Sequence, residues 1–220
     1  MNNSIINMYN KRRDKKRKRE NDDDGSELLK LFKGNEIDTE GNHIYFYTDV
    51  NQESCLDLNR KLIRLQNTIL KQKMDLNLEE TPKIYLHINS PGGCLFSGFS
   101  TLDVIKYSKV PVVTIIEGMA ASAATMMSIV AKERYMTPNS YMLIHQLSSG
   151  LWGKFEEQVD DFRNSSTLMD NIIQLYLEHT NIKEKKLKKM LKRDIYWNYD
   201  ECKKNGLVDG MWCNGLIEEE

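Results

Sequence analysis

The side chain with the clearest potential for chemistry in this sequence belongs to Ser122. It follows an apolar run at residues 112–116 (VVTII) and a set of small residues at 118–121 (GMAA). This pattern predicts a buried strand that ends in a tight turn, with the serine at the start of a helix. Backbone N–H groups and the positive end of the helix dipole would then lie beside its hydroxyl. A serine in such a place can attack a carbonyl group whose oxygen becomes negative.

To cleave an amide, an attacking serine needs a base, an acid that holds the base in the right tautomer, and two N–H donors for the oxyanion. His145 is the candidate base, because it ends the strand-like segment 142–144 and its ring can emerge at a sheet edge. Asp194 is the candidate acid. The N–H groups of Gly93 and Ala123 are candidates for the oxyanion hole, where the loss of one donor typically costs about 100–1000-fold in rate.

These residues also admit interpretations without catalysis. Small residues after a strand usually let a helix pack closely against a sheet, and a single serine there is most often a helix cap. Asp200 and Asp209 are alternative acids to Asp194, and spacing alone does not choose among the three. The catalytic interpretation therefore depends on all the parts taken together.

The elements that must position these side chains alternate between strands and helices. Strands are expected at 44–47, 83–88, 110–116, 134–136 and 141–144, and helices at about 56–70, 97–107, 121–131, 155–179, 184–191 and 200–205. This alternation predicts an α/β domain with helices over a mainly parallel sheet. Sites in such folds form where strand ends meet helix starts, and both the Gly92-Gly93 pair and Ser122 occupy such junctions.

The composition fits one globular domain. The chain has 220 residues, of which 40 % are hydrophobic and 29 % are charged, with a net charge of −1. A charge so close to zero gives no field that would attract nucleic acid. No apolar run is long enough for a membrane span, and the N-terminus lacks the apolar stretch of a secretory signal. The cysteines are scattered, and the histidines have no ligand-like spacing, so we expect reduced thiols, a cytoplasmic location, no metal and no cofactor.

The two ends of the chain differ from its middle. A basic block runs from Lys11 to Arg19 and an acidic stretch follows it, so residues 1–42 are expected to be disordered or weakly ordered. The basic block would suit nuclear import or a nucleic-acid arm, and a solvated tail explains it equally well. The folded domain is expected at 43–213, with a short acidic tail at 214–220.

The long helix expected at 155–179 has two different halves. Its first half is polar except for a thin stripe formed by Phe155, Val159 and Phe162. A helix of that kind either projects into solvent or meets a partner. The second half carries Leu168 and Ile172 at helical spacing and is expected to face the core.

Four segments of the sequence resemble motifs of the Clp protease proteolytic subunit. Residues 85–93 (YLHINSPGG) are similar to the strand and turn signature of that family, and residues 118–122 (GMAAS) to its active-serine motif. Residues 138–146 (PNSYMLIHQ) resemble the active-histidine motif. Residues 193–194 and 205–209 resemble the segment that holds the third triad member. The motifs occur in the order of the family, over about residues 43–211.

The resemblance implies the ClpP/crotonase-like fold, in which strand-strand-helix units repeat as a superhelix with a long protruding helix. It implies a serine endopeptidase that cleaves unfolded polypeptides with Ser122, His145 and Asp194. Gly92, Gln146 and Leu147 would lie along the bound substrate. It also implies a homo-oligomer of stacked heptameric rings joined by the long helix, fed by a separate ring ATPase. Residues 1–42 do not resemble the apolar hairpin with which the family usually meets that ATPase, so the sequence leaves this partner open.

Two other functions remain open on the sequence. A crotonase-type acyl-CoA enzyme uses the same kind of oxyanion hole but commonly relies on acidic residues, and Ser122, His145 and Asp194 together argue against it. A catalytically weak or inactive ring or scaffold subunit would keep the fold without the chemistry. The unusual N-terminus favours this last interpretation, and the three triad candidates oppose it.

Overall fold

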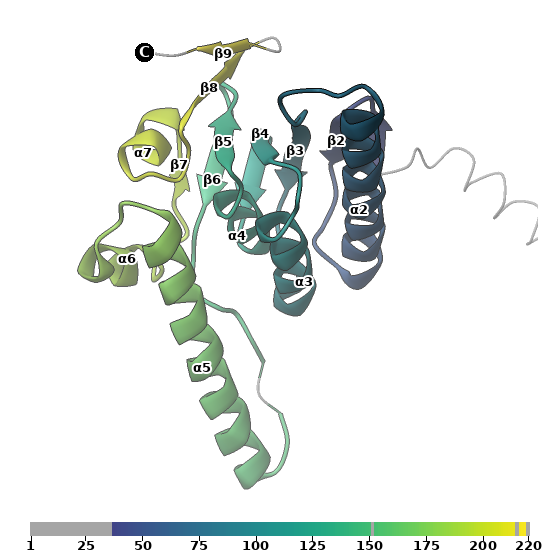
Figure 1. The fold of residues 1–220 in the computed structure, drawn as a ribbon. Coiled ribbons are helices and arrows are strands. Elements are labelled where there is room, and N and C mark those ends of the chain that lie inside the picture. Colours follow the sequence, from purple (N-terminus) through teal and green to yellow (C-terminus); the bar gives the residue numbers. More distant parts are fainter. Residues whose placement is uncertain (1–36, 151, 214–215, 219–220) are drawn as a thin grey trace, which may run out of the picture. The chain divides into compact units, whose positions relative to one another are not determined.

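The computed structural model describes residues 37–150, 152–213 and 216–218. The basic block and most of the expected N-terminal tail therefore lie outside the described residues. Within the described part, strands and helices alternate along the chain and the strands join into one sheet (Figure 1).

The sheet has 9 strands, and its main path runs β1-β2-β3-β4-β5-β8-β9. On this path lie β1 (Ile37–Glu40), β2 (His43–Phe46), β3 (Ile84–Ser90), β4 (Val112–Ala121), β5 (Glu133–Met136), β8 (Gly210–Cys213) and β9 (Leu216–Glu218). Off the path, β6 (Tyr141–Leu143) pairs with β4, and β7 (Tyr196–Trp197) pairs with β6. The β2–β3, β3–β4, β4–β5, β4–β6 and β5–β8 pairs are parallel. The predicted mainly parallel sheet is confirmed.

Six helices connect the described strands: α2 (Gln52–Asp75), α3 (Leu95–Lys106), α4 (Ala123–Ile129), α5 (Phe155–His179), α6 (Glu184–Met190) and α7 (Tyr199–Lys204). The start of α2 shows why these boundaries fall where they do. The Asn51 side chain accepts a hydrogen bond from the Ser54 N–H at 2.9 Å, and the Ser54 hydroxyl accepts one from the Asn51 N–H at 3.1 Å. Such a reciprocal cap satisfies two helix-end donors and fixes the first turn.

Helices α2, α3 and α4 pack on one face of the sheet (Figure 1). Alternate strand residues on that face, including Ile44, Phe46, Leu86 and Ile88, are fully buried in the main hydrophobic core. Full burial of each such side chain stabilises the fold by about 1.5–3 kcal/mol. A second, smaller buried cluster contains Val113, Ile115, Tyr135 and Trp212 and lies on the opposite face, because successive strand residues alternate between faces.

The sheet begins earlier than the expected start at His43. Strand β1 lies inside the segment expected to be weakly ordered and pairs with β2 through a two-residue turn at Gly41 and Asn42. Gly41 has φ of 56°, which glycine adopts without strain, and Ile37 is buried. A Gly-Asn pair between two strands is a hairpin signal that could have been found in the sequence. At the other end, β9 lies within the segment expected to be a short acidic tail and pairs with β8.

None of the helices in the described ranges combines the length and the apolar character that a membrane span requires.

Candidate active site

Ser122 is the single residue between β4 and α4. Its backbone has φ 53° and ψ −122°, a left-handed conformation that costs a residue with a side chain on the order of 1–3 kcal/mol. Its N–H donates to the Leu143 carbonyl at 2.8 Å, and its carbonyl accepts from the Thr125 N–H at 3.0 Å. These bonds hold the strained turn, so the serine is fixed at the point where the strand reverses into the helix. The strand reaches Ala121 instead of the expected end at 116, which makes the turn tighter than predicted.

Gly92 packs closely against this turn. A Cβ atom on Gly92 would lie 2.4 Å from the Ala121 carbonyl oxygen and 2.8 Å from the Ser122 Cβ. Both distances are too short for any side chain, so only glycine lets the segment before α3 approach the serine turn. Gly92 is not among the described residues that line the cavity beside Ser122, although the sequence predicted it as a substrate-binding residue.

The N–H of Gly93 is directed away from its neighbouring chain. Val50 donates to the Gly92 carbonyl at 2.8 Å, and Cys94 donates to the Val50 carbonyl at 2.7 Å. In a parallel bridge of this kind, the N–H of the middle residue points to the other side of the strand. Ala123 is the first residue of α4, and the first N–H groups of a helix have no partner within it. Gly93 and Ala123 both line the cavity that contains Ser122.

His145 and Asp194 are brought together by a short antiparallel pair of strands. Strand β6 precedes the histidine, β7 follows the aspartate, and Leu143 pairs with Tyr196 between them. The Nδ1 atom of His145 then lies 3.0 Å from Oδ1 of Asp194. The histidine side chain is 26 % exposed and the aspartate side chain 77 % exposed. A carboxylate bonded to Nδ1 leaves Nε2 as the imidazole nitrogen that can accept a proton.

Ser122 and His145 line the same cavity, which has a volume of about 440 Å³. Within the described part of the chain, no hydrogen bond joins the serine hydroxyl to the imidazole. Catalytic hydrogen bonds are often long without substrate and tighten when it binds. Gln146 and Leu147, which the sequence predicted as substrate-binding residues, line this cavity.

The walls of the cavity come from segments that lie far apart in the sequence. Its lining includes the start of α3, the start of α4, the segment after β6 and the inner side of α5, with the apolar residues Leu95, Met126, Leu147, Leu168 and Ile172. Three serines, Ser148, Ser149 and Ser165, supply most of the polar lining beyond the triad candidates. No Asp or Glu is among the described lining residues. An apolar recess beside a hydroxyl and an imidazole fits an uncharged substrate segment.

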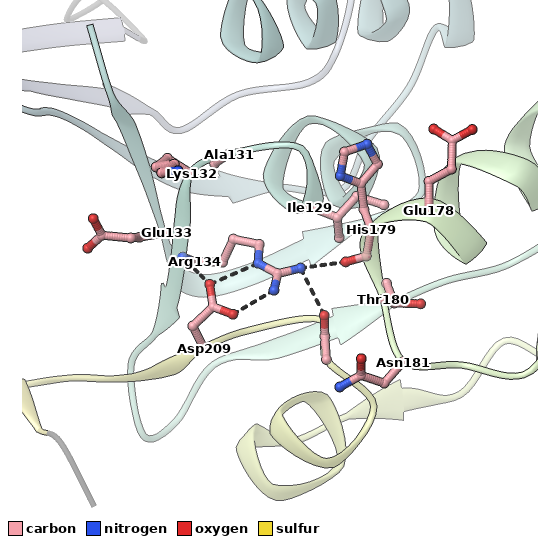
Figure 2. A pocket seen from close by; sticks show the side chains of 11 residues that line it. Ile129, Ala131, Lys132, Glu133, Arg134, Glu178, His179, Thr180, Asn181 and Asp209 are labelled. Carbon is pink, nitrogen blue, oxygen red and sulfur yellow. Dashed lines mark hydrogen bonds and ion pairs between the residues drawn. The ribbon is translucent and has the colours of Figure 1, made fainter.

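The alternative acids lie elsewhere. Arg134 binds Asp209 through Nη2 to Oδ1 at 2.6 Å and through Nε to Oδ2 at 3.0 Å. Figure 2 shows this pair in a second cavity, of about 430 Å³, where the same guanidinium also donates to the carbonyl of His179. Asp200 lies in the first turn of α7. Of the three candidate acids, Asp194 is the one whose carboxylate contacts His145.

Two side chains near the serine turn escaped the sequence analysis. The Thr125 hydroxyl donates to the Ser122 carbonyl at 2.7 Å and also bonds the hydroxyl of Tyr176 from α5. Both side chains are buried. Thr125 stands three positions after Ser122 at the start of a helix, which is a recognisable spacing for a side chain that bonds back to the backbone. Nothing in the sequence indicates its contact with Tyr176.

The comparisons with known proteins agree over most of the chain. A sequence model described as Clp protease matches residues 39–214. The chain is 32 % identical over 205 residues to the ATP-dependent Clp protease proteolytic subunit 2 of Treponema denticola, which covers 92 % of this chain and 94 % of that protein. It is 33 % identical over 174 residues to the ATP-dependent Clp protease proteolytic subunit 1 of Chlamydia caviae, with 76 % and 85 % covered.

A third relative is the ATP-dependent Clp protease proteolytic subunit of Deinococcus radiodurans, 31 % identical over 149 residues, which cover 66 % of this chain and 73 % of that protein. The family match spans the strands and helices that form the site, and the resemblance seen in the sequence motifs is confirmed. The chain belongs to the Clp protease family of serine peptidases.

Proposed function

We propose that this chain hydrolyses peptide bonds of unfolded polypeptides with Ser122 as nucleophile, His145 as general base and Asp194 as the acid that orients the base. The observation that carries the proposal is the shared cavity: Ser122 and His145 both line it, and the histidine is bonded to Asp194 at 3.0 Å. The family supplies the reaction class, and the geometry supports the assignment of each role.

The reaction would begin when the carbonyl carbon of a substrate peptide lies beside the Ser122 hydroxyl. His145 Nε2 takes the hydroxyl proton as the serine oxygen bonds to that carbon. The carbonyl oxygen becomes an oxyanion and accepts hydrogen bonds from the N–H groups of Gly93 and Ala123. Asp194 keeps the proton of the neutral imidazole on Nδ1 and stabilises the imidazolium that forms.

Collapse of the tetrahedral intermediate would then break the peptide bond. The imidazolium of His145 gives its proton to the leaving amine, and the acyl group stays on Ser122 as an ester. Water repeats the sequence with the same base and oxyanion donors and releases the acid. Gln146, Leu147 and Gly93 line the cavity and would align the substrate beside Ser122.

The assembly is part of the proposal. Phe155 and Phe162 on the first half of α5 are 75 % and 69 % exposed, and that half is polar apart from these two side chains and Val159. Exposed aromatic side chains in that setting favour contact with a second copy of the chain. We infer stacked heptameric rings joined through α5, with the active sites inside. The relatives are named as ATP-dependent, so a ring ATPase that delivers the polypeptide belongs to the same proposal.

The alternative functions fit the site less well. A crotonase-type acyl-CoA enzyme commonly uses acidic residues, and no Asp or Glu lies among the described residues that line the cavity. An inactive ring or scaffold subunit is favoured by the unusual N-terminal sequence and by the lack of a hydrogen bond between Ser122 and His145 in the described structure. The four cysteines, Cys55, Cys94, Cys202 and Cys213, are free thiols, which suits a cytoplasmic location.

An active-site fluorophosphonate tests the proposal directly. The full-length wild-type chain should be labelled, and mass spectrometry of its peptides should place the label on Ser122. Ser122→Ala should abolish both labelling and cleavage of a fluorogenic peptide. Native mass spectrometry of the same sample reports the assembly. An assembled ring with an unlabelled wild-type serine would assign the chain to the scaffold function.

A further inference from the structure

We propose that Thr125 and Tyr176 are positioning residues that fix the oxyanion-hole donor of Ala123. They form a hydrogen-bond chain that begins on α5 and ends at the carbonyl oxygen of Ser122. This inference rests on the proposed function, because it assigns a purpose to these residues only if Ser122 is the nucleophile.

The direction of this hydrogen-bond chain follows from counting the hydroxyl protons. The Thr125 hydroxyl has one proton, and it is donated to the Ser122 carbonyl oxygen at 2.7 Å. The Thr125 oxygen can then only accept from the Tyr176 hydroxyl, to which it is also bonded. The order is therefore Tyr176 to Thr125 to the carbonyl of Ser122. Burial raises the pKa of Tyr176, so its hydroxyl keeps the proton that this order requires.

The receiving carbonyl belongs to the peptide group that also carries the proposed oxyanion donor. The C=O of Ser122 and the N–H of Ala123 lie in one rigid plane and point in opposite directions. A bond that fixes the carbonyl therefore fixes the N–H. Donation to the carbonyl also polarises the peptide group and makes its N–H a stronger donor. The helix N–H of Thr125 adds a second bond to the same oxygen, at 3.0 Å.

The conformation of Ser122 explains why this plane needs support. Its φ of 53° lies outside the regions that residues with a Cβ prefer, so the turn stays in place only when its surroundings hold it. The N–H of Ser122 is held by Leu143, and the carbonyl is held by Thr125. Rotation of the peptide plane between Ser122 and Ala123 would move the Ala123 N–H away from the oxyanion.

The contact with Tyr176 distinguishes this arrangement from an ordinary helix start. A threonine that bonds back to a carbonyl in its own helix is common and has no necessary role in catalysis. Here a second element, α5, contributes a tyrosine that is 2 % exposed and whose single polar atom meets the Thr125 hydroxyl. Buried polar chains of this kind specify one arrangement when every member is satisfied.

The test compares variants that remove one hydroxyl at a time. Thr125→Val removes the hydroxyl at similar volume and should lower kcat for a fluorogenic peptide by about 10–100-fold, with KM changed by less than about twofold. Tyr176→Phe should lower kcat by roughly 3–10-fold, since the Thr125 bond remains but is weakened. Thr125→Ser keeps the donor and should restore kcat to within about threefold of wild type. The double variant Thr125→Val, Tyr176→Phe should be no slower than Thr125→Val, because both changes act on the same hydrogen-bond chain.

Two matched controls separate positioning from folding. Thr114 is a buried threonine whose hydroxyl donates to the Ser128 carbonyl at 3.1 Å, and Tyr135 is a buried tyrosine whose hydroxyl donates to Glu133 at 3.1 Å. Thr114→Val and Tyr135→Phe should change kcat by less than about twofold. The melting temperature of every variant is measured alongside.

Each outcome decides a different question. If wild-type protein is not labelled by the fluorophosphonate, the proposed function fails before the variants are compared. If wild type is labelled and cleaves peptide, and folded Thr125→Val and Tyr176→Phe match its kcat, the positioning role is overturned. If Thr125→Val does not fold, Tyr176→Phe and Thr125→Ser still decide it, since the first must lose activity and the second must keep it.

Discussion

The N–H of Ser122 donates a 2.8 Å hydrogen bond to the carbonyl of Leu143, two residues before His145. The proposed nucleophile is therefore attached to the strand that carries the proposed base. Leu143 also pairs with Tyr196, two residues after Asp194. Strand β6 thus sets the spacing of all three residues of the proposed triad. Substitutions of these residues should have separable effects.

Ser122→Gly should remove activity and stabilise the fold at the same time. Glycine adopts φ of 53° freely, so the strain at this turn disappears and the free energy of unfolding should rise by about 1 kcal/mol. Ser122→Ala also removes the hydroxyl but retains the strain, so its melting temperature should stay near that of wild type. Differential scanning calorimetry of the pair checks this. Equal melting temperatures for the two variants would contradict it.

Asp194→Asn should inactivate the site and leave the fold intact. The amide can keep a contact with His145 but favours the wrong tautomer of the imidazole, so kcat/KM should fall by roughly 1000–10000-fold. The Asp194 side chain is 77 % exposed, so the melting temperature should change little. Asp200→Asn is the matched control and should retain activity. Full activity of Asp194→Asn would assign the acid role to another residue.

Gly92→Ala should damage both folding and activity. The new Cβ would lie 2.4 Å from the Ala121 carbonyl, so the chain must shift at the serine turn. We expect a loss of roughly 3 kcal/mol in the free energy of unfolding, measured by urea denaturation. Gly150→Ala is the control, because a Cβ there meets nothing within 4 Å. A stable, active Gly92→Ala protein would disprove the close approach.

Stability should fall on acidification because His43, His87 and Glu117 are joined by hydrogen bonds on the sheet. His43 Nδ1 lies 2.9 Å from His87 Nε2, and His87 Nδ1 lies 2.9 Å from the Glu117 carboxylate. Burial and the neighbouring His87 lower the pKa of His43 from its ordinary 6.5, although Glu40 and Glu117 oppose this. Burial alone would raise the pKa of Glu117, but hydrogen bonds from His87 and Tyr47 outweigh it and lower the pKa from 4.5.

Groups with lowered pKa values bind fewer protons in the folded chain than in the unfolded chain. The stability they provide is present at neutral pH and declines as the pH falls, below 6.5 for His43 and below 4.5 for Glu117. Urea denaturation at several pH values should show the free energy of unfolding falling as the pH is lowered. His43→Gln should reduce the part of this fall that begins below pH 6.5 without abolishing it, because burial also lowers the pKa of His179. A slope unchanged in His43→Gln would exclude His43 as a source.

The double variant Phe155→Ser, Phe162→Ser should weaken self-association without unfolding the monomer. These side chains are 75 % and 69 % exposed, so their removal costs the isolated chain little. Native mass spectrometry over a range of concentrations should show the assembly dissociating at higher concentration than in wild type. Tyr107→Ser, at the C-cap of α3 where the side chain is 73 % exposed, is the control. An unchanged assembly would remove α5 from the interface.

The parts of the fold that were predictable from the sequence are those with local signals. Helix α5 was expected at 155–179, where it lies, because its second half repeats apolar residues at helical spacing. Strand β7 was not predicted, since a segment of 2 residues carries too little pattern, and β8 was not predicted either. The same limit applied to the candidate acids. Spacing could not separate Asp194 from Asp209, because the β6–β7 pairing and the Arg134 contact join positions far apart in the chain.

Strand β4 is bonded to three neighbours, β3, β5 and β6, whereas β7, the strand next to Asp194, has 2 residues and one neighbour. Local opening on warming should start where few backbone bonds hold the chain, so the histidine–aspartate half of the site should come apart while the serine half is still locked in the sheet. A partly opened molecule would then carry an intact hydroxyl with no base to activate it. Warming would therefore inactivate such a protein before it could cleave neighbouring molecules.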